Sequence, residues 1–475
     1  MKTVKVGGCG MMWGDLIQPS VEMAEKADVH YQCYDFLSEF TMSLLYRLRQ
    51  RSPLSGYPTD VVEWNKRLLP IAIKKGIRLV SNGGGANPEI VADEILYVAQ
   101  ALEVPLKLGI VTGDDVLDTI KRLRKEGMKF PNTDTGEEDI TSIEDKVIGA
   151  HAYIGADQII EALKAGCDEI VGGRFSDNAL YVGPMMYEFG WEYKEPYWNK
   201  IGAAITAGHI VESSRSCCGA MSSIWREIPE PWHPGYPIVE MNEDGTAVIT
   251  KTPDTGGLVN RQTIREQLVY EILDPRNYIM PDGIADLTTV HLEDMGQNGV
   301  RITNMTGKPR PDKLKVGIGF HGGFLFDVTV HIVWPDVLEK ARMCKKHFQE
   351  WLKWANVHPL EWEVQIDGVN MCLGPTVSVD EIEEKYGRDI PEIGVRFATK
   401  WQTREEAEFF RRELGRVWSI FPGLPFGQHV PPAPIRITAF WPTLIPRSEV
   451  HPALAIKEGR LLGRRQNGSR DTKDG

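Results

Sequence analysis

The sequence has no long apolar run and no regular spacing of cysteines. No stretch of about 18 apolar residues is present to span a membrane. The first residues, MKTVKVGG, lack the apolar core of a signal peptide. The seven cysteines are an odd number without regular spacing, which predicts free thiols in a reducing compartment. We therefore expect a cytoplasmic protein that has no membrane partner.

Positive charge is also scarce. The net charge is −12, and the only dense basic segment is IKEGRLLGRRQ at residues 456–466. Proteins that bind nucleic acid usually carry a basic patch, so we expect no nucleic acid as partner. The remaining composition, 42% hydrophobic and 25% charged, is that of a globular protein. A length of 475 residues predicts roughly two or three domains.

Short β-like runs alternate with helical patterns over the first 210 residues. This alternation predicts βαβ units and an α/β class with a mostly parallel, doubly wound sheet. Parallel strands are covered on both faces and read as continuous apolar runs, as EIV and LGIV do here. The expected strands lie at 2–8, 30–36, 77–82, 106–113, 146–154 and 168–173, and the clearest helices at 87–102 and 156–166.

The pattern changes twice beyond residue 235. The segment PIVEMNEDGTAVITK predicts a hairpin. From residue 313 we expect paired strands at 315–320 and 326–334 and a helix at 335–355, in a β-β-α-β-β-α-β order typical of a ferredoxin-like α+β domain. The predicted parts are an α/β core at 1–310 with a mixed β-rich segment at 235–310, a smaller C-terminal α+β domain at 311–455, and a disordered basic tail at 456–475.

Glycines and polar residues follow five of the predicted strands. Ligands of open α/β sheets bind at the carboxyl ends of the strands, so we expect these residues to line a shared cleft. After the first strand the glycines permit close approach of a ligand, although their spacing departs from the dinucleotide fingerprint. The residues at the strand ends are Gly8, Gly10, Gly14 and Asp15; Asp35 and Glu39; Asn82, Gly84 and Asn87; Asp114 and Asp115; and Arg174, Ser176 and Asp177.

Most of these residues have a structural alternative. Asp35 and Glu39 could form a solvated helix face, and the glycines at 83–85 could serve a tight turn only. Asp114 or Asp115 could cap one helix N-terminus, and Ser176 or Asp177 another. These alternatives stay open at the level of the sequence.

Arg174 gives the strongest indication of a ligand. A guanidinium after a buried strand needs a partner, and a carboxylate or phosphate suits its fork. We predict that Arg174 faces an open cleft and binds the anionic group of a substrate, with Asp177 beside it and with little effect of Arg174 on the fold. The alternative is a structural ion pair of Arg174 with Asp177 or Asp114.

Two later segments add candidates. In AGHIVESS, His209 and Glu212 are three residues apart and share one helix face. This spacing suits an acid–base pair, two metal ligands or a structural hydrogen bond. If Asp15 and Glu39 converge with them, a divalent cation such as Mg, Mn or Zn could bind. Lys251, beside a glycine turn, could bind a carboxylate or phosphate or lie on the surface.

These segments together resemble the acyclic terpene utilisation family, the AtuA type. The matching motifs extend in order from about residue 3 to 310 and include GGCGMMWGD (7–15), SNGGGANP (81–88), the stretch 152–184, AGHIVESS (207–214) and TKTPDTGGLV (250–259). The positions that match the family's pattern are Asp15, Asp35, Glu39, Asn82, Asn87, Asp114, Arg174, Asp177, His209, Glu212, Lys251, Glu266 and Gln267.

The resemblance implies degradation of acyclic terpenoid acids, as free carboxylates or as acyl-CoA thioesters. Many carboxylates and a histidine with little redox apparatus suit proton transfer next to a carbonyl, so we expect a lyase or hydratase. In this hypothesis the catalytic residues are Glu39, Asp177, His209 and Glu212. The substrate-binding residues are Gly8, Gly10, Asp15, Asn82, Gly84, Asn87, Asp114, Arg174 and Lys251.

Two other functions remain open. The glycine loop at 7–14 could hold the phosphate of a nucleotide, or the chain could be a non-catalytic subunit of a multi-protein catabolic complex. The sequence names no cofactor. We also expect a homo-oligomer.

Overall fold

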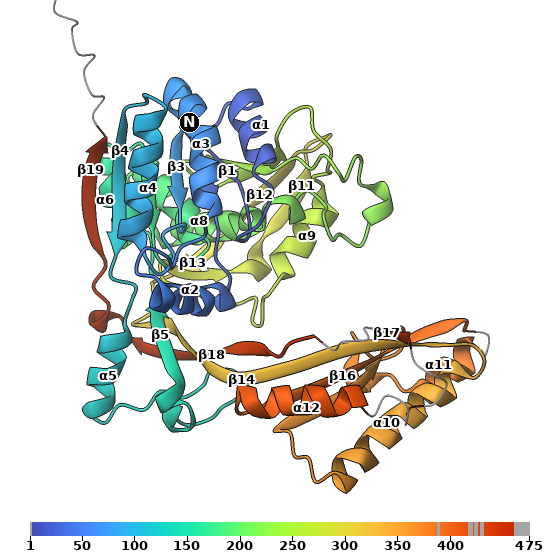
Figure 1. Ribbon diagram of the computed structural model, residues 1–475. Helices are drawn as coiled ribbons and strands as arrows, with labels where there is room; N and C mark the ends of the chain where they lie inside the picture. The colour runs from blue at the N-terminus through green and yellow to red at the C-terminus, as the bar shows by residue number, and fades with distance from the viewer. Residues whose placement is uncertain (1, 387–389, 417–420, 422–425, 428–431, 460–475) are drawn as a thin grey trace, which may run out of the picture. The chain divides into compact units, whose positions relative to one another are not determined.

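The computed structural model describes residues 2–386, 390–416, 421, 426–427 and 432–459 (Figure 1). The chain divides into two compact units. The first consists of Met1–Gly319 together with Phe440–Gly475, and the second of Phe320–Ala439. The candidate site lies in the first unit.

A mixed ten-stranded sheet forms the centre of the first unit. Its five middle strands are parallel and follow the order β1 (Thr3–Gly8), β2 (Tyr31–Tyr34), β3 (Arg78–Ser81), β6 (Glu169–Gly172) and β4 (Leu106–Thr112). Antiparallel strands flank them: β7 (Pro237–Asn242), β8 (Ala247–Lys251), β12 (Val300–Thr303) and β11 (His291–Asp294) beyond β1, and β19 (Ala453–Gly459) beyond β4. The carboxyl ends of the five parallel strands therefore lie along one edge of the sheet.

The predicted α/β class is confirmed, as are the hairpin β7–β8 and the position of each predicted core strand. A mostly parallel, doubly wound sheet is not confirmed, because antiparallel strands extend the sheet on both sides. In addition, the strand expected at 146–154 does not join the ten strands. It forms β5 (Val147–Ala152), which pairs with β14 (Lys313–Val333).

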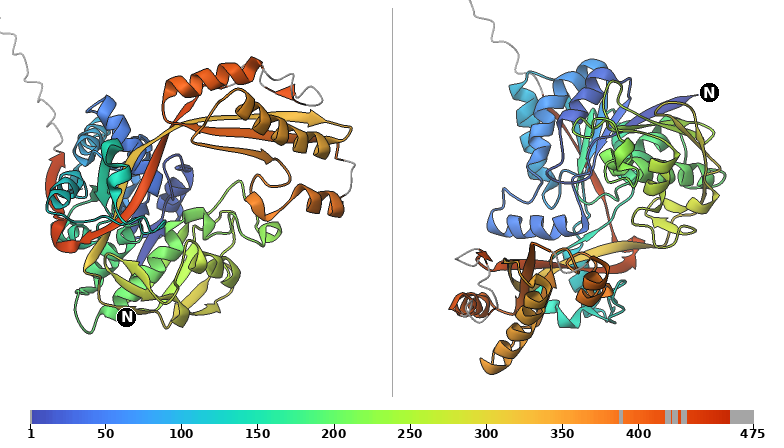
Figure 2. Two further views of the ribbon diagram at one scale, coloured as in Figure 1. Left: turned by 90° about the horizontal axis from the view of Figure 1, so that it is seen from below. Right: turned by 90° about the vertical axis from the view of Figure 1, so that its right-hand side faces the viewer.

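Helices cover the sheet in two groups (Figures 1 and 2). On one face a buried cluster joins Leu108 and Val171 of the strands to Trp64 and Ile95 of the helices. The neighbouring strand residues point to the opposite face, because side chains alternate along a strand. The first group is α1 (Gln18–Lys26), α3 (Asp60–Lys75) and α4 (Pro88–Ala101), and the second is α6 (Asp157–Lys164), α7 (Ala179–Phe189) and α8 (Trp198–Glu212).

The other elements of the first unit are smaller. A three-stranded antiparallel sheet has the order β13-β10-β9. These strands and the remaining helices are β9 (Tyr278–Met280), β10 (Gly283–Asp286), β13 (Thr306–Lys308), α2 (Glu39–Arg51), α5 (Leu117–Lys125) and α9 (Arg261–Val269).

The second unit contains a sheet with the order β15-β16-β14-β17, and β18 also pairs with β14. The two strands expected at 315–320 and 326–334 are one continuous strand, β14, so that prediction was wrong and a ferredoxin-like domain is not confirmed. Phe348 and Phe410 from two helices pack on Phe397 of the sheet. The elements are α10 (Val337–Trp354), β15 (Glu361–Ile366), α11 (Val379–Tyr386), β16 (Glu392–Trp401), α12 (Arg404–Arg416), β17 (Phe426–Gly427) and β18 (Ile435–Pro446).

The chain returns to the first unit after residue 439. There β19 pairs with β4 over its whole length, from Ala453 opposite Thr112 to Gly459 opposite Leu106. The sequence had assigned these residues to the C-terminal domain and the tail. The rest of the predicted tail, 460–475, lies outside the described residues. Within the described chain, no helix is both long and apolar enough to cross a membrane.

Candidate functional site

The site is built where four neighbouring strands end. Asp35 follows β2, Asn82 follows β3, Arg174 follows β6 and Asp114 follows β4, and these strands are adjacent in the sheet. Hydrogen bonds join the strand ends in pairs. Asn82 Nδ2 donates to Asp35 Oδ1, and the backbone N–H of Arg174 donates to Asp114 Oδ2 over 2.8 Å. The predicted meeting of polar residues at one edge of the sheet therefore holds for these four.

The two positions before Arg174, Gly172 and Gly173, have no room for a side chain, because neighbouring side chains fill the space beside them. A Cβ at Gly173 would overlap both carboxylate oxygens of Asp114, and a Cβ at Gly172 would overlap the ring of Phe175. The two glycines thus admit Asp114 and Phe175.

Arg174 is wholly buried, which corrects the prediction of an exposed cleft residue with little packing. Its Nη1 donates to Asp177 Oδ1 and, over 2.8 Å, to the carbonyl oxygen of Phe175. Its guanidinium carbon lies 4.4 Å from the ring centroid of Tyr153. The ion pair with Asp177 confirms one of the structural partners that the sequence had offered for Arg174.

Two nitrogens of Arg174 remain unused. Nε and Nη2 have no hydrogen-bond partner among the described residues. A buried donor without an acceptor costs about 1–3 kcal/mol, and more when it is charged. These N–H groups therefore suit an oxygen atom of a ligand.

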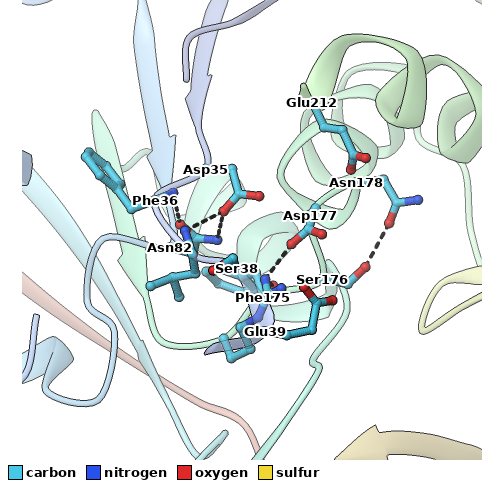
Figure 3. A network of polar contacts seen from close by, with 12 residues as sticks. Asp35, Phe36, Ser38, Glu39, Asn82, Phe175, Ser176, Asp177, Asn178 and Glu212 are labelled. Atoms are coloured by element: carbon cyan, nitrogen blue, oxygen red, sulfur yellow. Dashed lines mark hydrogen bonds and ion pairs between the residues drawn. The ribbon is translucent and has the colours of Figure 1, made fainter. Parts of the chain in front are cut away.

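Several carboxyl groups surround Arg174. Figure 3 shows Asp177 between Asp35 and Glu212, with Glu39 nearby. Burial and the proximity of Asp177 raise the pKa of Asp35 and of Glu212 well above the usual range. Burial alone would also raise the pKa of Glu39, but Arg174 and Lys315 lower it. The site thus combines two carboxyl groups of raised pKa with one of lowered pKa.

Tyr153 and Lys315 were not predicted from the sequence. Lys315 Nζ lies 3.6 Å from Glu39 Oε1 and 4.7 Å from the Tyr153 ring, so the ring contacts two cations. The Tyr153 hydroxyl is buried and has no hydrogen-bond partner among the described residues. Tyr153 follows β5 and Lys315 lies in β14, and the pairing of these two strands could not be read from the sequence.

His209 and Glu212 share one face at the end of α8, as their spacing predicted. His209 Nδ1 lies 3.3 Å from Glu212 Oε1, yet the two groups are not oriented for a hydrogen bond. Burial lowers the pKa of His209 to about 4. At neutral pH the imidazole is therefore neutral, and it lies beside a carboxyl group whose pKa is raised. We call this set the Arg174 cluster: Asp35, Glu39, Asn82, Tyr153, Arg174, Asp177, His209, Glu212 and Lys315.

Three other predicted residues make contacts of their own. Asp15, after β1, accepts from Arg215 Nη1 and from the backbone N–H of Leu16. Lys251 Nζ donates to the carbonyl oxygen of Thr255 over 2.6 Å, within its own turn. Asn87 donates to the carbonyl oxygens of residues 53 and 55 and does not cap α4 with its side chain.

The predicted ligand-binding glycines are also explained within the chain. A Cβ at Gly8 would overlap the carbonyl oxygen of Val211, and a Cβ at Gly10 would overlap the Tyr34 ring. A Cβ at Gly84 would lie 2.6 Å from the carbonyl oxygen of Gly172. Close packing between segments therefore accounts for these glycines.

Asp114 and Asn87 meet at a pocket of about 150 Å³. Arg49 also lines it and donates to Asp115 Oδ2 over 2.8 Å. Burial raises the pKa of Asp114 to about 6. Asp114 thus contacts both this pocket and the backbone of Arg174.

The predicted convergence of Asp15, Glu39, His209 and Glu212 on a cation is not supported, because Asp15 is paired with Arg215. Within the described ranges, no group of three or more His, Cys, Asp and Glu side chains is arranged to hold a metal ion.

Comparison with known proteins identifies the family. A family model described as acyclic terpene utilisation family protein AtuA matches residues 4–456. The chain belongs to the AtuA family. The match covers both units of this AtuA-family chain and includes every residue of the Arg174 cluster. Neither a curated protein nor a solved structure matches the chain.

Proposed function

We propose that this AtuA-family chain is an enzyme of acyclic terpene utilisation that acts on a carboxylic acid or its acyl-CoA thioester. The reaction is a proton transfer next to the carbonyl, of the lyase or hydratase type. The observation that carries the proposal is the buried guanidinium of Arg174, whose Nε and Nη2 lack partners among the described residues and which is surrounded by carboxyl groups.

Arg174 binds the carbonyl oxygen of the substrate in this proposal. Negative charge grows on that oxygen when a proton leaves the adjacent carbon, and fixed donors in a buried site stabilise such charge. Glu212, with its raised pKa, and the neutral His209 supply a proton donor and a proton acceptor for the group that leaves or adds in the lyase or hydratase reaction. Asp177 and Glu39 hold the two cations in place and complete the set of proton-carrying groups.

Exchange of substrate protons for solvent deuterium tests this function. The protein is incubated in D₂O with CoA thioesters of acyclic terpenoid acids and with the free acids, and mass spectrometry measures the incorporated deuterium. We expect incorporation next to the carbonyl with the wild type and with the surface variant Arg122→Lys. We expect at least a tenfold lower rate with Arg174→Lys, which loses the two-pronged contact. No incorporation by the wild type from any compound would rule the function out.

A further inference from the structure

The structure holds one carboxyl group in the Arg174 cluster more firmly than the others. We propose that Asp35 exchanges the proton with the substrate carbon and that Asn82 is its positioning residue. This assignment rests on the proposed function. It adds which residue exchanges the proton on the substrate carbon next to the carbonyl.

Asp35 is fixed through one oxygen only. Its Oδ1 accepts from the backbone N–H of Leu37 over 2.9 Å and from Asn82 Nδ2. Its Oδ2 has no hydrogen-bond partner among the described residues, although the side chain is nearly buried, with 5% of the residue exposed. The free oxygen is therefore held in a set direction and remains available to a ligand.

Asn82 can present only its amide nitrogen to Asp35. Its Oδ1 accepts from the backbone N–H of Phe36 over 2.7 Å, which fixes the orientation of the amide. Figure 3 shows the chain of contacts from Phe36 through Asn82 to Asp35. Asn82 lies at the end of β3 and is completely buried, so neighbouring atoms hold this orientation.

The surroundings of Asp35 favour proton transfer. Arg174 and Asp177 are its charged neighbours. Burial and Asp177 raise the pKa of the carboxyl group, which makes its ionised form a stronger base. In this proposal the unused nitrogens of Arg174 hold the substrate carbonyl at the same time.

The proposed step balances without a further reactant. The carbon–hydrogen bond next to the carbonyl breaks, and the proton forms a bond with Asp35 Oδ2. The electron pair moves into the carbonyl to give an enolate, whose oxygen is bound by Arg174. The proton on Asp35 Oδ2 is replaced by one from the solvent, and transfer of that solvent proton to the enolate carbon completes the exchange.

Asp177 and Glu39 are less suited to this role. Asp177 is bound to Arg174 and its side chain is 33% exposed. Glu39 is paired with Lys315 and its side chain is 39% exposed. Water would compete for a proton at these groups more readily than at Asp35.

Deuterium exchange with matched variants tests the assignment. General acid–base catalysis contributes roughly 10²–10⁴-fold, so we expect Asp35→Asn to lower the exchange rate by at least 100-fold. We expect Asn82→Ala to lower it about tenfold. Asp244→Asn and Asn242→Ala, which lie in the β7–β8 hairpin, serve as controls and are expected to keep the wild-type rate.

A measurement without substrate tests the positioning by Asn82. The Asp35 carboxyl resonance, assigned by its loss in Asp35→Asn, is titrated by NMR in protein labelled with ¹³C-aspartate. We expect Asn82→Ala to move its titration midpoint by at least half a unit while the midpoint stays constant in Asn242→Ala. If Asn82→Ala does not fold, Asn82→Asp, which also removes the amide donor, replaces it.

The outcomes separate this assignment from the proposed function. Wild-type exchange in Asp35→Asn, together with loss of exchange in Arg174→Lys, overturns the role of Asp35 and leaves the proposed function intact. An unchanged midpoint in Asn82→Ala overturns the positioning role. Absence of exchange in the wild type overturns the proposed function, and the role of Asp35 falls with it.

Discussion

Four of the contacts described above meet at Arg174. Its backbone N–H binds Asp114, its Nη1 binds Asp177 and the carbonyl oxygen of Phe175, and its guanidinium lies over the Tyr153 ring. Only the last three depend on the side chain. Substitutions of Arg174 therefore separate its contribution to stability from its contribution to binding.

We predict that Arg174→Ala lowers the free energy of unfolding by about 3–5 kcal/mol, because one partner of a buried ion pair is removed. Asp177 is partly exposed, which places the expected value near the lower end. Arg174→Lys should lose less stability because it keeps the charge. Urea unfolding measures both, with the surface variant Arg122→Ala as control. An unchanged stability of Arg174→Ala would contradict the structural role of this side chain.

Glu169 makes stability depend on pH. It is completely buried in β6, and burial raises the pKa of its carboxyl group to about 8. Because the folded-state pKa is higher than the ordinary value of 4.5, the stability contributed by the protonated form is complete below pH 4.5. It is lost as the pH rises from there through about 8.

We predict that Glu169→Gln removes most of this loss. At about 1.4 kcal/mol for each pH unit, the variant should gain a few kcal/mol relative to the wild type between pH 5 and pH 8. Urea unfolding measures the free energy of unfolding of both proteins at pH 5 and at pH 8. Subtracting the wild-type change from the change in the variant cancels the contributions of other titrating groups. If the free energies of unfolding of the two proteins change with pH in the same way, Glu169 is not the cause of the pH dependence of stability.

The elements explain which site residues the sequence could predict. Continuous apolar runs correctly indicated parallel strands, and parallel strands place Asp35, Asn82, Asp114 and Arg174 at one edge. The order of the strands depends on contacts between distant segments, so the pair Asp35–Asn82 could not be predicted, nor could the backbone N–H of Arg174 be identified as the group that binds Asp114. The same limit applies to Asp15, whose partner lies 200 positions further along the chain.

Gly173 tests the packing at the end of β6. In Gly173→Ala the new methyl group would overlap the Asp114 carboxylate, so Asp114 must move away from the backbone N–H of Arg174. We expect a loss of about 1–3 kcal/mol in the free energy of unfolding. At Gly299 the nearest atom to a new Cβ is Met295 Cβ at 3.5 Å, an ordinary contact. Gly299→Ala is the matched control, and an equal loss in both variants would refute the proposed overlap.

At the scale of the molecule, the second unit is inserted into the first. Local patterns predicted a second domain from residue 311, because helix and strand periodicity changes there. They could not predict that the chain returns to the first sheet, because a short apolar run such as ALAI does not identify its partner strand. Pairing of β19 with β4 is a contact between distant segments.

We predict that the first unit folds without the second. Gly317 and Phe440 are in close contact, so a short Gly/Ser linker can join Gly319 to Phe440 in place of residues 320–439. This shortened chain should unfold in a single cooperative transition in urea. A chain that ends at Gly319 lacks β19 and the bond from Trp441 Nε1 to the Phe130 carbonyl oxygen, and it should not fold. Cooperative unfolding of the chain that ends at Gly319 would contradict this view.

The late return of the chain has a consequence during synthesis on the ribosome. β4 is translated by residue 112, but β19 begins only at residue 453. Throughout the interval, the edge of β4 that β19 later covers lacks its partner, and unpaired strand edges favour aggregation. The first unit therefore completes its sheet only after nearly the whole chain has been made. The nascent protein should depend on chaperones that bind its N-terminal half until translation ends.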